Sequence, residues 1–199
     1  MTDTSNYLSD DDVILMLKFQ QGDNSAFEQL LEKYHAPIIN FIFKFIADRF
    51  EAEDLAQNVF LSIYRSQKTY VPRAKFSTWI YTIARNLALN ELRRKRNRKE
   101  SSLEETIENE GGNMQKQRAD NNVSSAAKEL EKQELAGIVK EVIDSLPQHQ
   151  KTAVILRRYE NFSYDEIARV IGCSVSAVKS LLSRAKSALK EGLAPYFKG

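Results

Sequence analysis

Apolar residues recur at every third or fourth position along most of this 199-residue chain, which is the period of a helix with one buried face. In the first half, this pattern predicts four helices, over residues 9–22, 23–47, 51–66 and 76–99. The alternation of apolar and polar residues that would indicate a strand does not extend over a useful length anywhere. We therefore expect a helical bundle at the N-terminal end.

The C-terminal end shows the same period in four further segments, over residues 130–146, 148–160, 163–171 and 175–193. The third segment is short, and it begins with Ser163 and Glu166 at the spacing of a capping box. Gly172 interrupts the chain after it, and Ser174 is suited to cap the helix that follows. A short helix, a glycine turn and a longer helix predict a helix-turn-helix within a four-helix unit.

The middle of the chain lacks this period. It contains Gly111-Gly112, several asparagines and serines and no aromatic residue, and residues 100–136 hold nine acidic residues against four basic ones. Such a composition is typical of a flexible linker. The expected fold class is therefore all-α, with two small helical domains, residues 1–98 and residues 128–199, joined by an acidic flexible linker over residues 99–127.

The overall composition is 42% hydrophobic and 28% charged, which is typical of a globular protein. With Cys173 as the only cysteine, the chain has neither an internal disulfide nor a cysteine cluster for zinc, so we expect no metal and no cofactor. The acidic N-terminus is unlike a signal or transit peptide, and the apolar run Ile38–Ile46 is too short to span a bilayer. We expect a cytoplasmic protein without membrane insertion.

Positive charge is concentrated at the end of the fourth predicted helix, where six of the seven residues 93–99 are Lys or Arg. Cations this close repel one another, and the phosphates of a nucleic acid would relieve that repulsion. The loop over residues 66–77 combines cations with a ring that can stack on a base: Lys68, Tyr70, Arg73 and Lys75. The alternative is a solvated basic tail, the usual role of a charge run, and the density of charge makes it the weaker interpretation.

The last long helix has one apolar face and one face of small hydroxyls and cations. Opposite the apolar positions lie Ser176, Ser180, Ser183 and Arg184, with Lys179 on a flank, and no acidic residue occurs from Arg169 through Lys190. Small side chains let a helix enter a major groove, where Arg and Lys reach base edges or phosphates. The alternative is an ordinary helical hairpin, but a merely solvated face usually mixes both signs of charge.

Several of these stretches also resemble motifs of one family. "LPQHQKTAVILRRYENFSYDEIARVIGCSVSAVKSLLSRAKSAL" resembles the C-terminal, promoter-reading domain of bacterial sigma factors. "GDNSAFEQLLEKY", "AEDLAQNVFLSIYR" and "FSTWIYTIARN" resemble the sigma domain that binds RNA polymerase and opens DNA. Two such domains in this order, with only a linker between them, resemble the extracytoplasmic-function group.

The resemblance implies a sigma factor that binds core RNA polymerase, directs it to promoters and helps open the −10 region. Its implied partners are core RNA polymerase, promoter DNA that is double-stranded at −35 and partly single-stranded at −10, and an anti-sigma factor. Polymerase docking is implied for Asp54, Gln57 and Phe60. Contacts to the −10 element are implied for Lys68, Tyr70, Arg73, Lys75, Arg85, Asn86, Asn90, Arg93, Arg94 and Arg96. Contacts to the −35 element are implied for Ser174, Ser176, Lys179, Ser180, Ser183 and Arg184.

Two other classes of function were weighed. An enzyme is disfavoured because Glu53 and Asp54 are adjacent and point about 100° apart on a helix, so they cannot face each other across a substrate. The sequence also has no glycine-rich phosphate loop and no nucleophile elbow. The nearer alternative is a stand-alone helix-turn-helix regulator, which would bind DNA without polymerase and would usually dimerise to read two half-sites.

Overall fold

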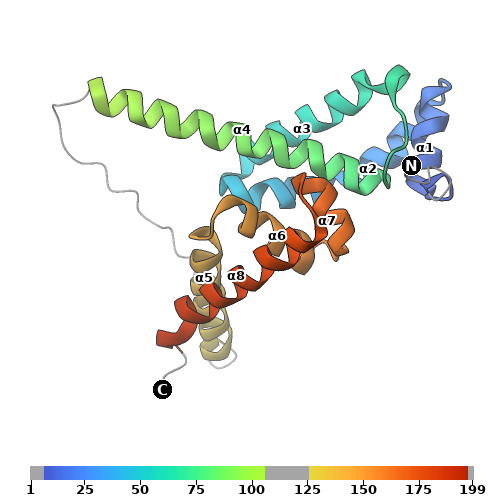
Figure 1. The fold of residues 1–199 in the computed structure, drawn as a ribbon. Coiled ribbons are helices and arrows are strands. Elements are labelled where there is room, and N and C mark those ends of the chain that lie inside the picture. Colours follow the sequence, from blue (N-terminus) through green and yellow to red (C-terminus); the bar gives the residue numbers. More distant parts are fainter. Residues whose placement is uncertain (1–6, 106–125, 197–199) are drawn as a thin grey trace.

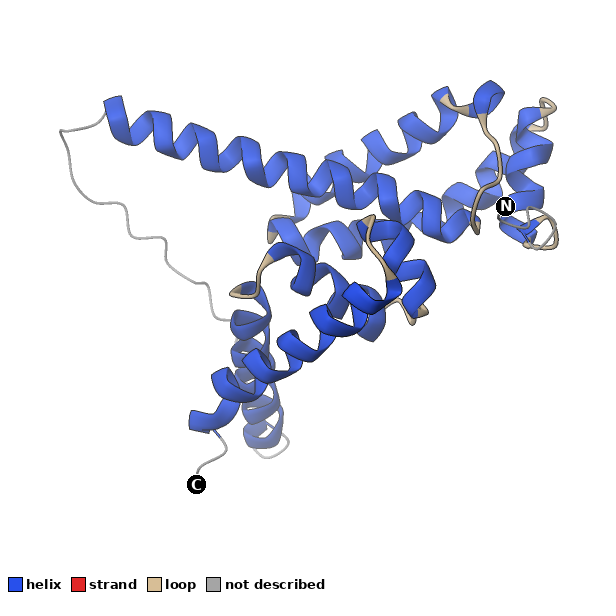
Figure 2. Cartoon of the chain, in the orientation of Figure 1, coloured by secondary structure: helices blue, strands red, loops and turns tan. Residues whose placement is uncertain are grey.

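The computed structural model describes residues 7–105 and 126–196, and these residues form helices joined by short turns, without a strand (Figure 2). The all-α fold class expected from the sequence is confirmed. The elements are α1 (Asp11–Gln20), α2 (Asn24–Ile46), α3 (Arg49–Arg65), the short 3₁₀ helix η2 (Gln67–Thr69), α4 (Phe76–Glu105), α5 (Ala126–Asp144), α6 (Gln148–Arg158), α7 (Tyr164–Ile171), α8 (Val175–Leu193) and η3 (Ala194–Tyr196).

Helices α1 to α4 form the N-terminal bundle, in which α2 packs against each of the other three. The side chains of Ile38, Phe41 and Ile42 on α2 are fully buried. The ring of Phe41 meets the rings of Phe45 and Tyr81 edge to face, with centroids 5.1 and 4.9 Å apart. Burying one such side chain stabilises a fold by about 1.5–3 kcal/mol, so this apolar stripe holds α2 and α4 together.

The predicted helix-turn-helix is present in α7 and α8. Ser163 and Glu166 form the capping box, because each side chain accepts a hydrogen bond from the other residue's backbone N–H. Gly172 ends α7 with φ +79°, a left-handed conformation that glycine adopts without a steric penalty. Ser174 then caps α8 by accepting a hydrogen bond from the N–H of Ala177 at 3.2 Å. Local sequence signals therefore fix both ends of the turn.

Helix α4 is longer than the sequence pattern predicted. It continues to Glu105, so residues 99–105 are helical where the linker was expected to begin. In Figure 1 its C-terminal half extends beyond the other helices. A projecting helix has no core to face and therefore needs no apolar period, and Arg96 and Glu100, 3.5 Å apart, offset part of its charge. Residues 126 and 127, the end of the predicted linker, are helical in α5. Residues 106–125 lie outside the described residues, and the domain boundaries remain predictions.

The N-terminal and C-terminal helices pack directly against each other, which the sequence did not predict. Helix α7 lies against α4. The rings of Tyr81 on α4 and Phe162 before α7 meet edge to face, with centroids 5.1 Å apart, and the Tyr81 hydroxyl donates a hydrogen bond to Glu160. Burial and this hydrogen bond raise the pKa of Tyr81. The buried residues of the two halves thus join into one core.

Candidate protein-binding and nucleic-acid-binding surfaces

One face of α3 points into solvent and combines polar and apolar side chains. Asp54 and Gln57 are exposed there, as expected for a docking surface. Leu61 and Tyr64, about half exposed, continue the same face at helical spacing. Sequence reasoning did not single out Leu61 and Tyr64, although their positions four and seven residues after Gln57 place them on its face and away from the buried stripe.

Phe60 is placed differently from the prediction. Its side chain is 6% exposed and lies beside the imidazole of His35, with ring centroids 6.3 Å apart. It lies at the bottom of a groove of about 390 Å³ that is lined by Phe27, Leu31, His35, Gln57, Phe60, Leu61 and Tyr64. Phe60 therefore shapes the groove, while Leu61 and Tyr64 supply most of the apolar area that a partner can reach.

The loop over residues 66–77, which leads into α4, is held to α1 by hydrogen bonds. The side-chain amide of Gln20 donates to the backbone carbonyls of Lys68 and Tyr70 at 3.4 and 3.1 Å. Tyr70 was expected to offer an accessible ring for stacking, but it is only 7% exposed and packs on Trp79, with centroids 4.8 Å apart. This corrects the prediction: the ring is turned inward because the backbone around it is held against α1.

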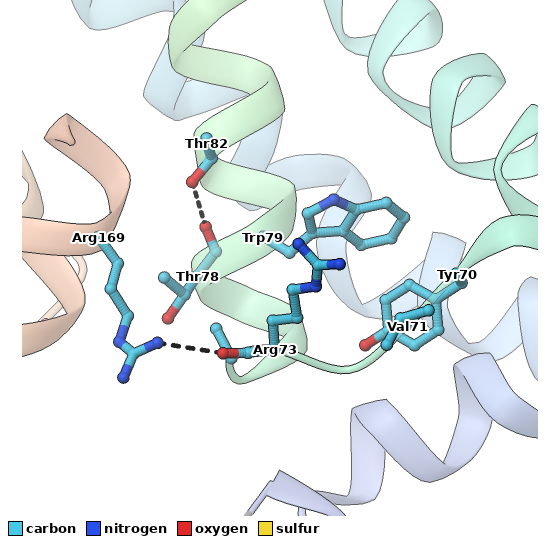
Figure 3. A pocket seen from close by; sticks show the side chains of 8 residues that line it. Tyr70, Val71, Arg73, Thr78, Trp79, Thr82 and Arg169 are labelled. Atoms are coloured by element: carbon cyan, nitrogen blue, oxygen red, sulfur yellow. Dashed lines mark hydrogen bonds between the residues drawn. The ribbon is translucent and has the colours of Figure 1, made fainter. Parts of the chain in front are cut away.

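A cavity of about 280 Å³ opens between this loop and the first turns of α4 (Figure 3). It is lined by Tyr70, Val71, Arg73, Ala74, Thr78, Trp79, Thr82 and, from α7, Arg169. Trp79 is half-buried, so part of its indole forms a wall of the cavity. The loop and α4 thus offer one concave, partly aromatic site.

Two polar atoms beside this cavity are buried without a hydrogen-bond partner in the structure: the Tyr70 hydroxyl and the Thr78 hydroxyl. Thr78 is only 2% exposed, and burial raises the pKa of Tyr70, so this phenol stays protonated at neutral pH. Buried polar groups are seldom left unsatisfied. Tyr70 and Thr78 both line the cavity, so these buried hydroxyls lie close to it.

The exposed face of α4 carries part of the predicted −10 set. Asn86, Asn90 and Arg93 are exposed and follow one another at intervals of four and three residues, which places them on one face. Arg96 is also exposed, one turn further on. The Arg94 side chain already has a partner within the chain, because its guanidinium donates to Glu91 at 2.8 and 3.1 Å.

Arg85 was predicted to contact DNA, but it is 7% exposed and covered by the C-terminal helices. Its Nη2 lies 3.4 Å from Nδ1 of His149, at the start of α6, and its Nη1 donates to Asn86 at 3.2 Å. Burial, and the nearby charge of Arg93, lower the pKa of Arg85. In this arrangement Arg85 is a contact between the two halves of the chain.

The three cations of the loop remain at the surface. Lys68, Arg73 and Lys75 are all exposed. Lys75 nevertheless pairs with the carboxylate of Glu166 on α7 at 2.9 Å, and the backbone carbonyl of Arg73 accepts a hydrogen bond from Arg169 at 3.0 Å. Lys75 and the backbone of Arg73 therefore contact the C-terminal helices.

The exposed face of α8 contains all six residues predicted to contact the −35 element. Ser174, Ser176, Lys179, Ser180, Ser183 and Arg184 are each exposed. Val178 and Ala185, on the opposite face, are fully buried. The Ser180 hydroxyl donates to the backbone of Ser176 at 3.1 Å, which keeps it close to the helix. The structure thus presents a helix face with small side chains and two projecting cations.

Neither a metal site nor a membrane span is found in the part of the chain that the structure describes. No three His, Cys, Asp or Glu residues within residues 7–105 and 126–196 lie close enough together to hold a metal ion. Over the same ranges, the helices lack the length and apolarity that crossing a bilayer requires.

Two protein-family models match the two halves of the chain in sequence. The model described as Sigma-70 region 2 matches residues 30–98, which include α3, the loop and the basic part of α4. The model described as Sigma-70, region 4 matches residues 136–189, which include the helix-turn-helix. The first match covers the α3 face and the surface formed by the loop and α4, and the second covers the exposed face of α8.

Curated relatives match along nearly the whole chain. The RNA polymerase sigma-H factor of Pseudomonas aeruginosa is 34% identical over 188 residues, which cover 92% of this chain and 94% of the relative. The ECF RNA polymerase sigma-E factor of Escherichia coli is 30% identical over 187 residues, which cover 94% of this chain and 96% of the relative.

Solved structures with a similar fold include two protein complexes. One is CnrH with the cytosolic domain of CnrY, with a TM-score of 0.66, 20% identity and coverage of 92% of this chain and 97% of that chain. The other is the sigma factor RpoE with the anti-sigma factor NepR from Bartonella quintana, with a TM-score of 0.60, 24% identity and coverage of 84% and 96%. At these identities the likeness concerns the fold.

The fold and the exposed faces define a helical DNA-binding protein of two parts, in which a basic helix accompanies a separate helix-turn-helix. The sequence matches are more specific. The chain belongs to the extracytoplasmic-function group of RNA polymerase sigma factors.

Proposed function

We propose that this chain binds core RNA polymerase through α3, reads the −35 element with α8, and holds the −10 element with the loop over residues 66–77 and α4. The observation that carries the proposal is that one chain exposes a mixed polar and apolar face and two basic faces on separate elements. A stand-alone regulator would use the α3 face only to dimerise, because its DNA contacts lie elsewhere.

The α3 face has the composition of a protein-binding site. Leu61 and Tyr64 are 49% and 52% exposed and lie along the groove, so a partner helix or loop can bury them further. Asp54 and Gln57 stand beside them as exposed hydrogen-bonding groups. A small apolar centre with polar groups at its rim is the usual anatomy of a protein interface.

At the −10 element, the cavity beside Tyr70 and Trp79 would receive an unstacked base. A base has an aromatic face that would stack on the part of the Trp79 indole that lines the cavity. The exposed Lys68 and Arg73 would contact the phosphates on either side of it. In this role the inward-facing Tyr70 helps to line the cavity and does not offer a stacking surface.

At the −35 element, α8 would lie in the major groove. Arg184 projects from the exposed face and is suited to a base edge, while Lys179 on the flank is suited to a phosphate. The hydroxyls of Ser176, Ser180 and Ser183 are short enough to let the helix approach the bases closely.

Core RNA polymerase and promoter DNA are therefore the partners we propose, with an anti-sigma factor as a third. The solved structure of similar fold in which the sigma factor RpoE is bound to the anti-sigma factor NepR supports an anti-sigma partner. The activity belongs in the cytoplasm, where polymerase and DNA are found. The chain would have no catalytic activity of its own, because polymerase performs the chemistry of transcription.

Gel filtration of the chain with core polymerase tests the α3 assignment. The unaltered chain is expected to elute with core, and Asp54→Lys is expected to elute largely as free protein, because a reversed charge would be buried at the interface. Glu141→Lys, an equal charge reversal on an exposed position of α5, serves as the matched control. Co-elution of Asp54→Lys at the level of the unaltered chain would contradict the assignment.

A further inference from the structure

Two side chains of α7 contact the loop that we assign to the −10 element. The carboxylate of Glu166 pairs with Lys75 at 2.9 Å, so that cation is neutralised within the chain. The Arg169 guanidinium donates to the backbone carbonyl of Arg73 at 3.0 Å. Figure 3 shows Arg169 reaching from α7 to the loop, opposite Tyr70 and Trp79.

Arg169 is also held from its other side. Its guanidinium carbon lies 5.4 Å from the centre of the Tyr7 ring, a cation–π distance. The same side chain lines the cavity next to Thr78 and Trp79. A base that entered the cavity would therefore meet Arg169 at its wall, and the strand on either side of the base would meet α7.

Further contacts keep α7 in this place. Phe162 packs on Tyr81, and the Tyr81 hydroxyl donates to Glu160, both in the segment that leads into α7. Arg85 lies 3.4 Å from His149 at the start of α6. All of these contacts involve α4 within three turns of the loop, so they position α7 beside the −10 surface.

The exposed face of α8 is not covered in the same way. Ser176, Lys179 and Arg184 are exposed to solvent in the same arrangement of the two halves. The packing is thus asymmetric: α7 covers part of the surface assigned to single-stranded −10 DNA, while the surface assigned to double-stranded −35 DNA is open.

We propose that Glu166 and Arg169 of α7 form an autoinhibitory contact, in which the C-terminal helices compete with single-stranded DNA for the −10 surface of the free chain. The inference rests on the function proposed above. Its physical basis is competition for the same groups, because the Glu166 carboxylate offsets the charge of Lys75 and repels a phosphate that approaches it. Lys75 stays 54% exposed at its side chain, so water screens the pair and DNA can displace the carboxylate.

The test compares the unaltered chain with the double variant Glu166→Gln/Arg169→Ala, which keeps the net charge. Glutamine still serves at the third position of a capping box, so α7 retains its start. The matched control is Lys190→Ala/Glu191→Gln, which makes the same charge changes at exposed positions near the end of α8. The probes are a short fluorescein-labelled single strand of random sequence and a duplex of the same length, measured by fluorescence anisotropy without polymerase.

The double variant is expected to bind the single strand at least about threefold more tightly, because the apparent affinity rises with the fraction of open molecules. Its affinity for the duplex should stay that of the unaltered chain, and the control should change neither. Adding Lys75→Ala to the double variant should remove the gain. If Arg169→Ala acted only by removing a positive charge, the double variant would bind the single strand more weakly and not more tightly.

Equal single-strand affinity of the unaltered chain and the double variant would overturn the proposal, as would an equal gain for the duplex. Promoter-dependent transcription with core polymerase is measured alongside. If the unaltered chain supports transcription and the strand affinities are equal, the autoinhibitory contact alone is refuted. If the chain supports no transcription, the proposed function falls, and this inference falls with it.

Discussion

Replacing Leu61 with alanine tests the α3 face most cleanly, because Leu61 is 49% exposed and lies along the groove without being needed for the core. Fully burying a leucine contributes about 1.5–3 kcal/mol, and about half of that burial is still available to a partner. Leu61→Ala should therefore weaken binding to core polymerase by about 1 kcal/mol, which is about fivefold in Kd. Tyr64→Ala would cost more but is harder to interpret, because its ring also packs on Phe19 and Phe27, with centroids 5.5 and 5.6 Å away.

The assay is a titration of labelled core polymerase with the chain, read by fluorescence anisotropy. Ile14→Ala is the matched control, because Ile14 is an apolar residue with 37% exposure on α1, away from the groove. The free energy of unfolding of both variants should lie within about 0.5 kcal/mol of that of the unaltered chain, as is usual for substitutions at exposed positions. If Leu61→Ala bound core with unchanged Kd, or if Ile14→Ala weakened binding equally, the α3 face would not be the docking surface.

Four further predictions follow from individual contacts. Arg93→Ala should lower the slope of log affinity for DNA against log salt concentration by about 1, and Arg94→Ala by clearly less, because Glu91 already holds the Arg94 guanidinium at 2.8 Å; equal slopes would contradict this. Gly172→Ala should lower the free energy of unfolding by about 1–2 kcal/mol, because φ is +79° there while the space around it is open; an unchanged melting curve would refute the strain. For Glu166, burial opposes ionisation, but hydrogen bonds from Lys75 and Ser163 outweigh it and lower the pKa below its ordinary 4.5, so the stability that this carboxylate adds should be present at neutral pH and lost as pH falls through the lowered pKa. Amide protection of α7 should therefore be weaker in acid than at neutral pH; protection that does not change with pH would contradict the pairing. If Arg184 reads a base, Arg184→Ala should remove about 1–3 kcal/mol of discrimination at one −35 position in transcription from single-base promoter variants; an unchanged preference at every position would exclude base reading.

The helix-turn-helix was predictable from the sequence because its signals are local. Ser163, Glu166, Gly172 and Ser174 each act within three or four residues, so their order along the chain determines the caps and the turn. The outward face of α8 followed from the same helical period. Its six predicted residues are all exposed, and their roles on DNA remain predictions.

The end of α4 and the orientation of Tyr70 could not be predicted in this way. Apolar period indicates a helix that faces a core, whereas the end of α4 projects and is supported by contacts such as Lys95 with Glu51 on α3. Tyr70 turns inward because Gln20, fifty residues earlier, holds its backbone carbonyl. Neither partner is recognisable from a pattern within a single segment.

The contact between the two halves of the chain also could not be predicted from the sequence. It depends on pairs such as Lys75 with Glu166 and Arg85 with His149, which lie far apart in the chain. Charged and polar residues of this kind are common in any sequence, so nothing in the sequence marks these four as partners. Only their positions in the folded chain show that Lys75 and Arg85, two residues of the predicted −10 set, contact the C-terminal helices.

Transcription with purified core polymerase tests the central claim most directly. Core alone and core with the chain are supplied with genomic fragments, and the 5′ ends of the transcripts are mapped. A sigma factor predicts discrete start sites that require the chain, share an upstream pair of elements and disappear with Asp54→Lys but not with Glu141→Lys. If the chain bound the same fragments by itself and the transcript ends were identical with and without it, the account would be contradicted.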